Sequence, residues 1–447
     1  MNIADTYTNN FTVNIQPQMP GIKRSVHRRL LLLAGIAFLV FASKIIFAQP
    51  KSIDFKDIVS KWKKNSIPKI NAELVVGKGY YSLLPVLGYA PANGFVIGGA
   101  ISFARLYGKP PTNLSSGMLN FQVTSKQQFI VNARSKIYLD ANNWFFQGDW
   151  RLLVFTQPTY GLGINNSEFE HTQLYVNNLV QTEETIGEPM KFDQIRFYEE
   201  VSHRIGDLRI YAGMGIAIDQ HFKIFDERLD TSAGSGNYFV TNHYKYSRQN
   251  GFNPDKYGTN GIKFTLLTDT RDNISNSYKG YFASISVLHN IKIANNSQQS
   301  TQFLYDARYY LGLNSDAPRH VLAFWSWGSI LINGNLPYLA LPAIGWDTYN
   351  RSGRGYVQGR FRGLSMIYNE AEYRYPISKN GLWGGTVFAN ATTVSSYNEK
   401  LFDNAALGLG AGLRMQLDKL ARTNLTVDIG IGTDHSSGIY FNLQETF

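Results

Sequence analysis

Cysteine is absent from the 447-residue chain, and charged residues and long apolar runs are scarce. Without cysteine, a disulfide scaffold, a thiolate metal site and a cysteine nucleophile are excluded together. Charged residues make up 17% of the chain, whereas about 25% is usual in a globular protein. After the first fifty residues, no apolar run reaches the roughly 18 residues of a membrane-spanning helix, which excludes a polytopic helical membrane protein.

Aromatic residues and glycine are abundant instead. The chain has 27 Tyr, 28 Phe, 7 Trp and 40 Gly, and its hydrophobic fraction of 44% is large enough to bury a core, which excludes a disordered chain. Much glycine, many aromatics and little charge favour an all-β protein, including one whose outer face is solvated by lipid.

The N-terminus predicts a secretory signal peptide over residues 1–48, with Met19 a more natural start than Met1. An apolar run over residues 30–42 follows a basic region, and Ala48 offers a small residue before the cleavage point. The basic region consists of Lys23, Arg24, Arg28 and Arg29. A buried helix or a membrane anchor is the alternative, although Lys44 interrupts the run. Together with the strand pattern described below, export of this kind predicts residence in the outer membrane of a Gram-negative bacterium.

Net charge gives no reason to expect a nucleic-acid partner. The whole chain carries +10, but after residue 48 only 38 basic and 32 acidic residues are left, a net charge of +6. These charges form no basic stripe, so we expect no nucleic-acid binding. Residues 49–78 are predicted to be a short periplasmic segment. In it, Phe55, Ile58, Val59 and Trp62 have the spacing of one amphipathic helix, with a linker as the alternative.

From residue 79 onward, apolar and polar residues alternate with period two. Phe303, Tyr305 and Ala307, for example, alternate with Asp306 and Arg308. Strands of soluble sandwiches usually have about 5–6 residues, whereas these segments have ten or more, as tilted strands that cross a bilayer do. A soluble sandwich is the alternative.

Sixteen such segments can be counted, an even number as in single-chain bacterial barrels. We expect strands near 79–89, 94–107, 115–125, 128–140, 143–156, 191–205, 207–221, 258–270, 280–292, 299–313, 319–333, 364–377, 382–395, 404–418, 423–433 and 437–447. The connections alternate between long and short, and the long ones include 157–190, 222–257 and 334–363. The predicted fold is therefore a transmembrane antiparallel β-barrel over residues 79–447, with short periplasmic turns and long external loops. A closed barrel also satisfies its backbone hydrogen bonds in lipid.

The C-terminal residues have a pattern of their own. Ser436, Gly438, Phe441 and Leu443 fit in register a polar, glycine, aromatic, apolar spacing, and Phe447 adds a terminal aromatic residue. This arrangement resembles the signal by which outer-membrane barrels are recognised for insertion. It predicts that Phe447 ends the last strand on the same face as Phe441, and that the barrel assembly machinery inserts this protein.

Three local sequences indicate which barrel this is. The first is Arg354-Gly355-Tyr356 in the long loop between the eleventh and twelfth segments. The second runs from Asn369 through Glu370, Glu372 and Arg374 to Pro376, where period two places these three charged residues on the lumen face. The third is Asp269-Thr270-Arg271-Asp272 before the ninth segment.

In these sequences, at these strand positions, the chain resembles the BamA/TamA family of the bacterial surface-antigen superfamily. The resemblance implies an inward-folded sixth external loop whose Arg354 docks on the barrel wall, and a role in outer-membrane protein assembly or translocation. The chain departs from the family twice. The stretch between Gln49 and Tyr80 is too short for the family's periplasmic POTRA repeats, so a separate periplasmic partner is expected. The family's wall aspartate is replaced by Asn390, so Glu372 or Glu370 is the expected counter-ion of Arg354.

Enzymatic function has little support in the sequence. None of the histidines after the signal peptide lies in a recognised catalytic motif. His221 and His243, at and within one long loop, are the best candidates for an external site. We therefore expect no enzyme, no cofactor and no metal. Assembly or translocation is the leading interpretation, a passive pore or structural barrel is the alternative, and an outer-membrane hydrolase is a third. Lipid of the outer membrane is the expected surroundings.

Overall fold

The computed structural model describes the larger part of the chain, and residues Pro50–Phe447 form one compact unit. The described residues are 53–55, 57–58, 75–90, 93–109, 112–165, 174–176, 179–181, 187–206, 208–232, 238–274, 276–293, 298–314, 319–419, 422–433 and 436–447. The predicted signal peptide lies outside them.

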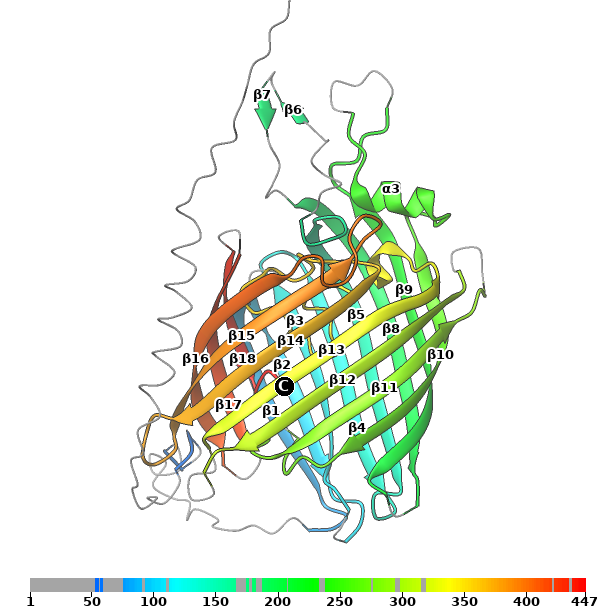
Figure 1. Cartoon of the computed structure of the whole chain (residues 1–447). Helices are drawn as coiled ribbons and strands as arrows, with labels where there is room; N and C mark the ends of the chain where they lie inside the picture. Colours follow the sequence, from blue (N-terminus) through cyan, green and yellow to red (C-terminus); the bar gives the residue numbers. More distant parts are fainter. Residues whose placement is uncertain are drawn as a thin grey trace, which may run out of the picture. The chain divides into compact units, whose positions relative to one another are not determined.

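One antiparallel sheet of sixteen strands makes up the fold (Figure 1), and each strand pairs with the next strand of this sheet along the chain. The strands are β1 (Gly79–Ala90), β2 (Gly94–Arg105), β3 (Ser115–Thr124), β4 (Phe129–Leu139), β5 (Trp144–Thr159), β8 (Glu188–Arg204), β9 (Ile210–Asp226), β10 (Tyr257–Asp269), β11 (Gly280–Asn290), β12 (Ser300–Gly312), β13 (Val321–Gly334), β14 (Ser365–Pro376), β15 (Trp383–Ser395), β16 (Ala406–Asp418), β17 (Thr423–Gly432) and β18 (Ser437–Leu443). The sixteen predicted segments are therefore confirmed.

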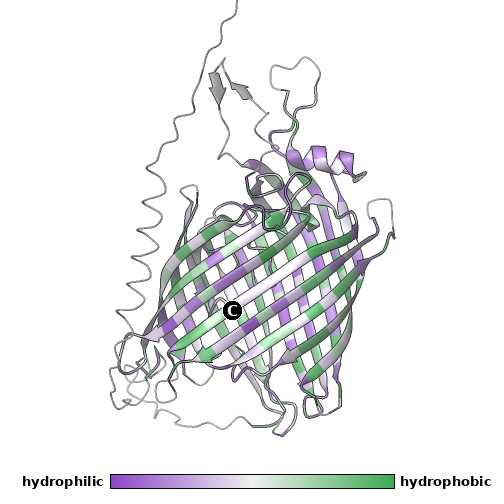
Figure 2. Cartoon of the chain, in the orientation of Figure 1, coloured by the Kyte–Doolittle hydropathy of each residue, from purple (hydrophilic) through white to green (hydrophobic). Residues whose placement is uncertain are grey.

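Alternation along each strand separates a lumen face from a lipid face. In β10, Thr265 and Leu267 are buried, whereas Phe264 and Leu266 are about half exposed on the outside. Figure 2 shows the resulting alternation of apolar and polar residues along the slanted strands. Exposed apolar area is unfavourable in water, at about 25 cal/mol per Å². A continuous band of it around the sheet is therefore the surface of a protein that resides in lipid.

The two edge strands of the sheet, β1 and β18, meet at a seam. A Cβ built on Gly88 would lie 3.5 Å from the Cβ of Phe441. The hydrogen-bonded order nevertheless begins at β1 and ends at β18, and no paired register joins these two described strands. The seam therefore lacks the ladder that stabilises the other strand pairs.

Among the described residues, four elements outside the large sheet were not predicted. They are the hairpin β6 (Leu174–Val176) and β7 (Leu179–Gln181), the helix α3 (Asn242–Gln249) and the 3-10 helix η2 (Tyr338–Ala340). Three-residue strands and a helix with only three buried residues are too short to give a clear hydrophobic period. The N-terminus of α3 is capped by Thr241, whose hydroxyl accepts from the backbone N–H of Tyr244 (3.2 Å).

The prediction for the last strand is wrong at its end. β18 stops at Leu443, and Gln444 takes a left-handed φ of 81° that turns the chain inward. Phe447 is consequently 6% exposed and lies inside the barrel, not on the lipid face with Phe441. Period two cannot detect this change, because a single residue of positive φ breaks the strand.

Of the predicted periplasmic helix, Phe55, Asp57 and Ile58 are helical, and Val59 and Trp62 lie outside the described residues. Asp54 and Asp57 accept each other's backbone N–H groups, at 3.2 and 2.9 Å. Asp57 also pairs with Lys419 (2.8 Å), beside the turn between β16 and β17. This segment is therefore held on the periplasmic turns. No helix among the described residues is long and apolar enough to cross a membrane.

Candidate functional site: a docked loop and a ring of charges

The sixth external loop, residues 335–364, connects β13 to β14 and crosses the lumen. Its first part packs Leu336, Tyr338 and Leu341 against the β5, β8 and β9 wall in one buried cluster. Its later part packs Ile344, Tyr356 and Phe361 in a second cluster with residues of β12, β13 and β14. The two legs of the loop are joined, because the N–H of Ile344 donates to the carbonyl of Phe361 (2.9 Å). The loop is thus a folded insert anchored on two sides of the barrel.

Arg354, near the tip of this loop, lies in the lumen with 2% of its surface exposed. Its guanidinium donates to Asp428 on β17 (2.9 Å) and to both Glu370 and Glu372 on β14. The same group lies 3.5 Å from the ring centroid of Phe388, a cation–π contact from β15. One loop arginine therefore bridges three strands of the wall.

Asn390 has a different contact from the one the sequence suggested. Its side-chain amide donates to the main-chain carbonyl of Arg354 (2.9 Å), and the guanidinium goes to the carboxylates instead. This placement agrees with the chemistry of the residue, because a neutral amide can orient the loop backbone but cannot neutralise a buried cation.

The charges around Arg354 close into a ring of alternating sign. Asp428 also accepts from Arg414 of β16 (2.5 Å), and Arg414 pairs with Glu445 (2.8 Å). Glu445 lies 3.9 Å from Arg374 of β14, which in turn pairs with Glu372 (2.7 Å). The ring therefore runs Arg354, Asp428, Arg414, Glu445, Arg374, Glu372 and back to Arg354. Glu370 is attached to it through Arg354, and it also accepts from the hydroxyl of Tyr368.

Such a ring is stable only when it is complete. Moving a charge out of water costs several kcal/mol, and partners of opposite sign must offset that cost. Each guanidinium here has carboxylates on more than one side, which suits its planar set of donors. Loss of one member would leave its neighbours buried and underpaired.

Gly355 and Tyr356 continue the docking on the side of β16 to β18. Gly355 has φ of 111°, and a Cβ on it would lie 2.9 Å from main-chain atoms of Ile431. Its N–H donates to the hydroxyl of Tyr440 (3.0 Å). The Tyr356 hydroxyl donates to the carbonyl of Leu407 (2.5 Å) and accepts from the N–H of Thr433 (2.9 Å). Glycine is required at position 355 by both the positive φ and the close approach to the main chain of Ile431.

The wall facing this tip is also made of glycine. A Cβ on Gly430 would lie 2.6 Å from the nitrogen of Gly355, and one on Gly408 would lie 2.8 Å from the carbonyl oxygen of Arg354. A Cβ on Gly432 would lie 2.4 Å from the ring of Tyr356. Because these glycines of β16 and β17 have no side chains, the loop backbone can lie directly against the backbone of the wall.

Electrostatics keep the loop arginines charged. Burial lowers the pKa of Arg354, but Glu370, Glu372 and Asp428 more than offset it, so the pKa of the guanidinium is well above its ordinary value. Burial, followed by the nearby Arg134 cation, lowers the pKa of Arg351 to about 10. Both side chains are therefore cations at neutral pH.

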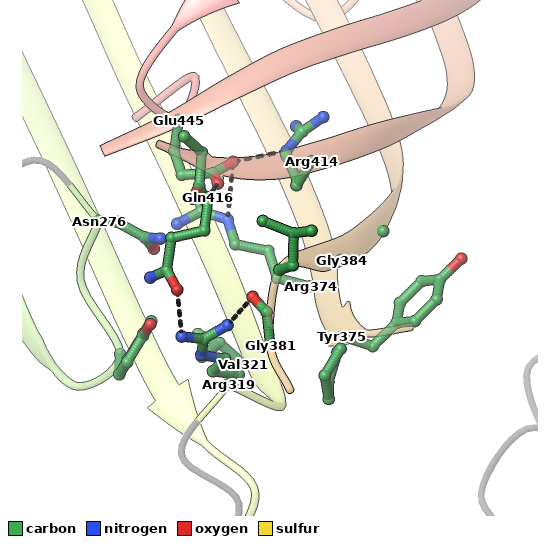
Figure 3. Close-up of a pocket in the computed structure, with 15 residues that line it drawn as sticks. Asn276, Arg319, Val321, Arg374, Tyr375, Gly381, Gly384, Arg414, Gln416 and Glu445 are labelled. Carbon is green, nitrogen blue, oxygen red and sulfur yellow. Dashed lines mark hydrogen bonds and ion pairs between the residues drawn. The ribbon is translucent and has the colours of Figure 1, made fainter. Parts of the chain in front are cut away.

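Glu445, two residues after the end of β18, lies near the periplasmic turns, and Figure 3 shows it with its neighbours. Arg414 and Arg374 both point toward Glu445, beside a small cavity of about 40 Å³. A second cavity of about 250 Å³ lies between loop 6 and the wall from β5 to β13.

The predicted turn of Asp269, Arg271 and Asp272 lies apart from the ring of charges. Arg271 donates to Asp269 (2.9 and 2.6 Å). Asp272 accepts from the N–H of Tyr278 (2.9 Å) and pairs with Arg422 (2.7 Å) at the start of β17. These contacts fix a periplasmic turn. In the predicted C-terminal pattern, Phe441 is 44% exposed on the lipid face, whereas Gly438 is buried.

The external histidines have structural surroundings. His243 is fully buried, with Nδ1 2.8 Å from Asp226 and Nε2 2.9 Å from the Tyr257 hydroxyl. His221 lies 3.8 Å from Asp219. Both nitrogens of His243 are thus occupied by the residues that fasten α3. No cluster of metal-binding side chains occurs within the described part of the chain.

Three members of the ring were missed in the sequence: Asp428, Arg414 and Glu445. Period two places Asp428 on the polar face of its strand, and the same alternation applies to Arg414 in β16. What the sequence alone does not supply is the relative height of residues on different strands, which follows from the strand register.

Sixteen strands, a lipid-facing apolar band and a loop docked in the lumen define the class of outer-membrane β-barrels. A family model described as the Omp85 superfamily domain matches residues 155–447, and the chain belongs to this superfamily. The predicted resemblance is thereby confirmed at the level of the superfamily.

A solved structure agrees in fold. BamA from Haemophilus ducreyi lacking POTRA domains 1–3 is similar with a TM-score of 0.51 and 14% identity, over 82% of this chain and 70% of that one. CdiB from Acinetobacter baumannii has 13% identity and a TM-score of 0.49, and the match covers 82% of this chain and 59% of CdiB. No curated protein matches the sequence. At 14% identity, the similarity to BamA shows the barrel fold.

Proposed function

We propose that this barrel assembles proteins into the outer membrane or translocates them across it. The observation that carries the proposal is the docked sixth loop, with Arg354 donating to Asp428, Glu370 and Glu372 in the lumen. A buried ring of charges is a weak source of net stability, because desolvation offsets much of the attraction. A two-state element that docks and releases is a more natural use of such a ring than a permanent brace.

The seam gives the second support. β1 and β18 touch at Gly88 and Phe441, and no paired register joins them. An edge strand with free N–H and C=O groups is a template on which another strand can pair. A client strand of an outer-membrane protein has the matching chemistry. A separate periplasmic partner would deliver this client to the turns where Asp57 pairs with Lys419. The protein's own insertion would use the barrel assembly machinery.

A disulfide across the seam tests the proposal. Gly88→Cys/Phe441→Cys brings two Cβ positions to 3.5 Å, within the roughly 3.5–4.5 Å that a disulfide needs. The chain has no other cysteine. We expect the oxidised variant to lower the amount of other folded barrels in cells that depend on this protein, and a reductant to restore it.

The matched control places the same bond between two ordinary neighbours. Ala389 of β15 and Leu409 of β16 are partners in the sheet register, so Ala389→Cys/Leu409→Cys should leave assembly unchanged. Normal assembly with the seam locked, together with steady conductance in planar bilayers, would reject the proposal and favour a passive pore.

A further inference from the structure

The last membrane strand is held in an unusual way. β18 has seven residues, fewer than any other strand of the large sheet, and β17 is its one hydrogen-bonded neighbour in that sheet. After Leu443 the chain does not continue along the wall but enters the lumen, through the left-handed Gln444. The N–H of Gln444 still donates to the main-chain carbonyl of Asn424 in β17 (2.7 Å). Residues 445–447 are therefore an internal tail that contacts side chains of the wall and the loop.

Wall residues bind this tail at two points. Glu445 accepts from Arg414 (2.8 Å) and from the amide of Asn424 (2.7 Å). The ring of Phe447 lies 5.4 Å from that of Trp325, with the guanidinium of Arg374 5.1 Å from its centroid. Arg374 also donates to the main-chain oxygen of Phe447 (3.1 Å). A carboxylate and an aromatic ring are thus each seated in a site of matching chemistry.

Loop 6 binds the same tail. Arg351, three residues before Arg354, donates to the carbonyl of Leu443 (2.8 Å) and to that of Glu445. Glu445 is also a member of the charge ring, three contacts from Arg354 by way of Arg414 and Asp428. The tail and the loop are therefore linked in two ways. Arg351 of the loop binds main-chain carbonyls of the tail, and Glu445 of the tail belongs to the same ring of charges as Arg354.

We propose that residues 444–447 are a lumenal latch that couples the end of β18 to the sixth loop. When the loop is docked, Arg351 and the ring hold the tail, and the tail holds the last strand against the wall. When the loop leaves, the tail loses partners that offset its desolvation, and when the tail leaves, the loop loses them likewise. Coupling of this kind is reciprocal, so each element must affect the other by the same factor. The proposal concerns internal coupling and does not depend on the assembly function.

Thiol accessibility tests the latch, because an introduced cysteine is the only thiol in the chain. Thr446→Cys reports on the tail, where Thr446 is 4% exposed. Val357→Cys reports on the loop. We expect Arg354→Ala to speed maleimide labelling of the tail thiol at least tenfold. We expect Glu445→Ala/Phe447→Ala to speed labelling of the loop thiol by a similar factor. Heat-modifiable mobility shows in each case that the barrel is folded.

Two further variants keep the test decisive. Arg360→Ala alters the same loop at a residue that contacts the ring of Tyr160 (4.6 Å) outside the charge ring, and it should leave labelling of the tail thiol unchanged. Glu445→Gln keeps the shape and should give a smaller increase at the loop thiol, in case the double substitution prevents folding. If the loop thiol becomes accessible in the Arg354 variant while the tail thiol stays protected, the two elements are independent and the latch is refuted. Normal barrel assembly in latch variants would bear only on the proposed function.

Discussion

Removing Arg354 should release the sixth loop, and the contacts indicate by how much. In Arg354→Ala, Glu372 keeps Arg374 and Asp428 keeps Arg414, whereas Glu370 loses its guanidinium and keeps the Tyr368 hydroxyl. The main cost is therefore one buried carboxylate without a cation. Breaking a buried pair from one side costs about 3–5 kcal/mol. At about 1.4 kcal/mol per factor of ten, the docking equilibrium should fall by two to three and a half powers of ten.

This assignment predicts which second substitution restores docking. Glu370→Gln removes the uncompensated charge, so Arg354→Ala/Glu370→Gln should recover part of the loss, and a double-mutant cycle should show coupling of more than about 1 kcal/mol. Arg354→Lys should retain part of the docking, because it keeps the positive charge but lacks the planar set of donors that spans carboxylates on β14 and β17. The assay is the labelling rate of Val357→Cys in intact cells. A rate within twofold of the parent in Arg354→Ala would refute the docking energetics.

Four other outcomes can be measured. Gly355→Ala should undock the loop tip, because the new Cβ strains the backbone at positive φ and contacts Ile431, and labelling of the loop thiol should become faster. Gly77→Ala, at a position where φ is also positive but the space is open, should leave that labelling rate unchanged. Phe447→Ala should destabilise the tail by about 3–5 kcal/mol, as for a buried ring, which labelling of Thr446→Cys would report; an unchanged rate would contradict the burial. Burial raises the pKa of Glu445, but Arg414 and Arg374 hold it below the ordinary 4.5. This carboxylate should therefore stabilise the latch fully above about pH 4.5 and lose that effect as the pH falls through its lowered pKa. Labelling of the tail thiol that rises with increasing pH would contradict this prediction. The mature protein should fractionate with the outer membrane and show heat-modifiable mobility, and recovery in the soluble periplasmic fraction would contradict the barrel.

Strand positions were predictable from the sequence because a barrel in lipid has only one pattern that works. Apolar and polar residues must alternate along each strand, and long and short connections alternate along the chain. The residues of β10 or β12 therefore identify their strands without any tertiary information. The docking arginine was predictable for a different reason, namely a family resemblance in a local motif.

Contacts between distant strands were not predictable in this way. The pairing of Arg354 with Asp428 and the seat of Glu445 depend on the register of several strands and on a single left-handed residue, Gln444. Phe447 shows the limit most clearly, since its terminal position suggested a lipid-facing aromatic, and its actual position is set by Trp325 and Arg374 inside the lumen. The small elements α3 and η2 owe their structure to tertiary packing, which local propensity does not describe.

The order in which the ring's members appear along the chain has a consequence for folding. Arg354 is synthesised first, and its partners follow on β14, β16, β17 and after β18. During insertion, the ring around the loop arginine stays open until Glu445 has entered the lumen, because Glu445 joins Arg414 to Arg374. Closure of the ring is then a late event of folding, because it depends on contacts of long sequence separation. A barrel stalled before its last strand would lack Glu445, and Arg374 and Arg414 would each lose one of the carboxylates that offset their burial.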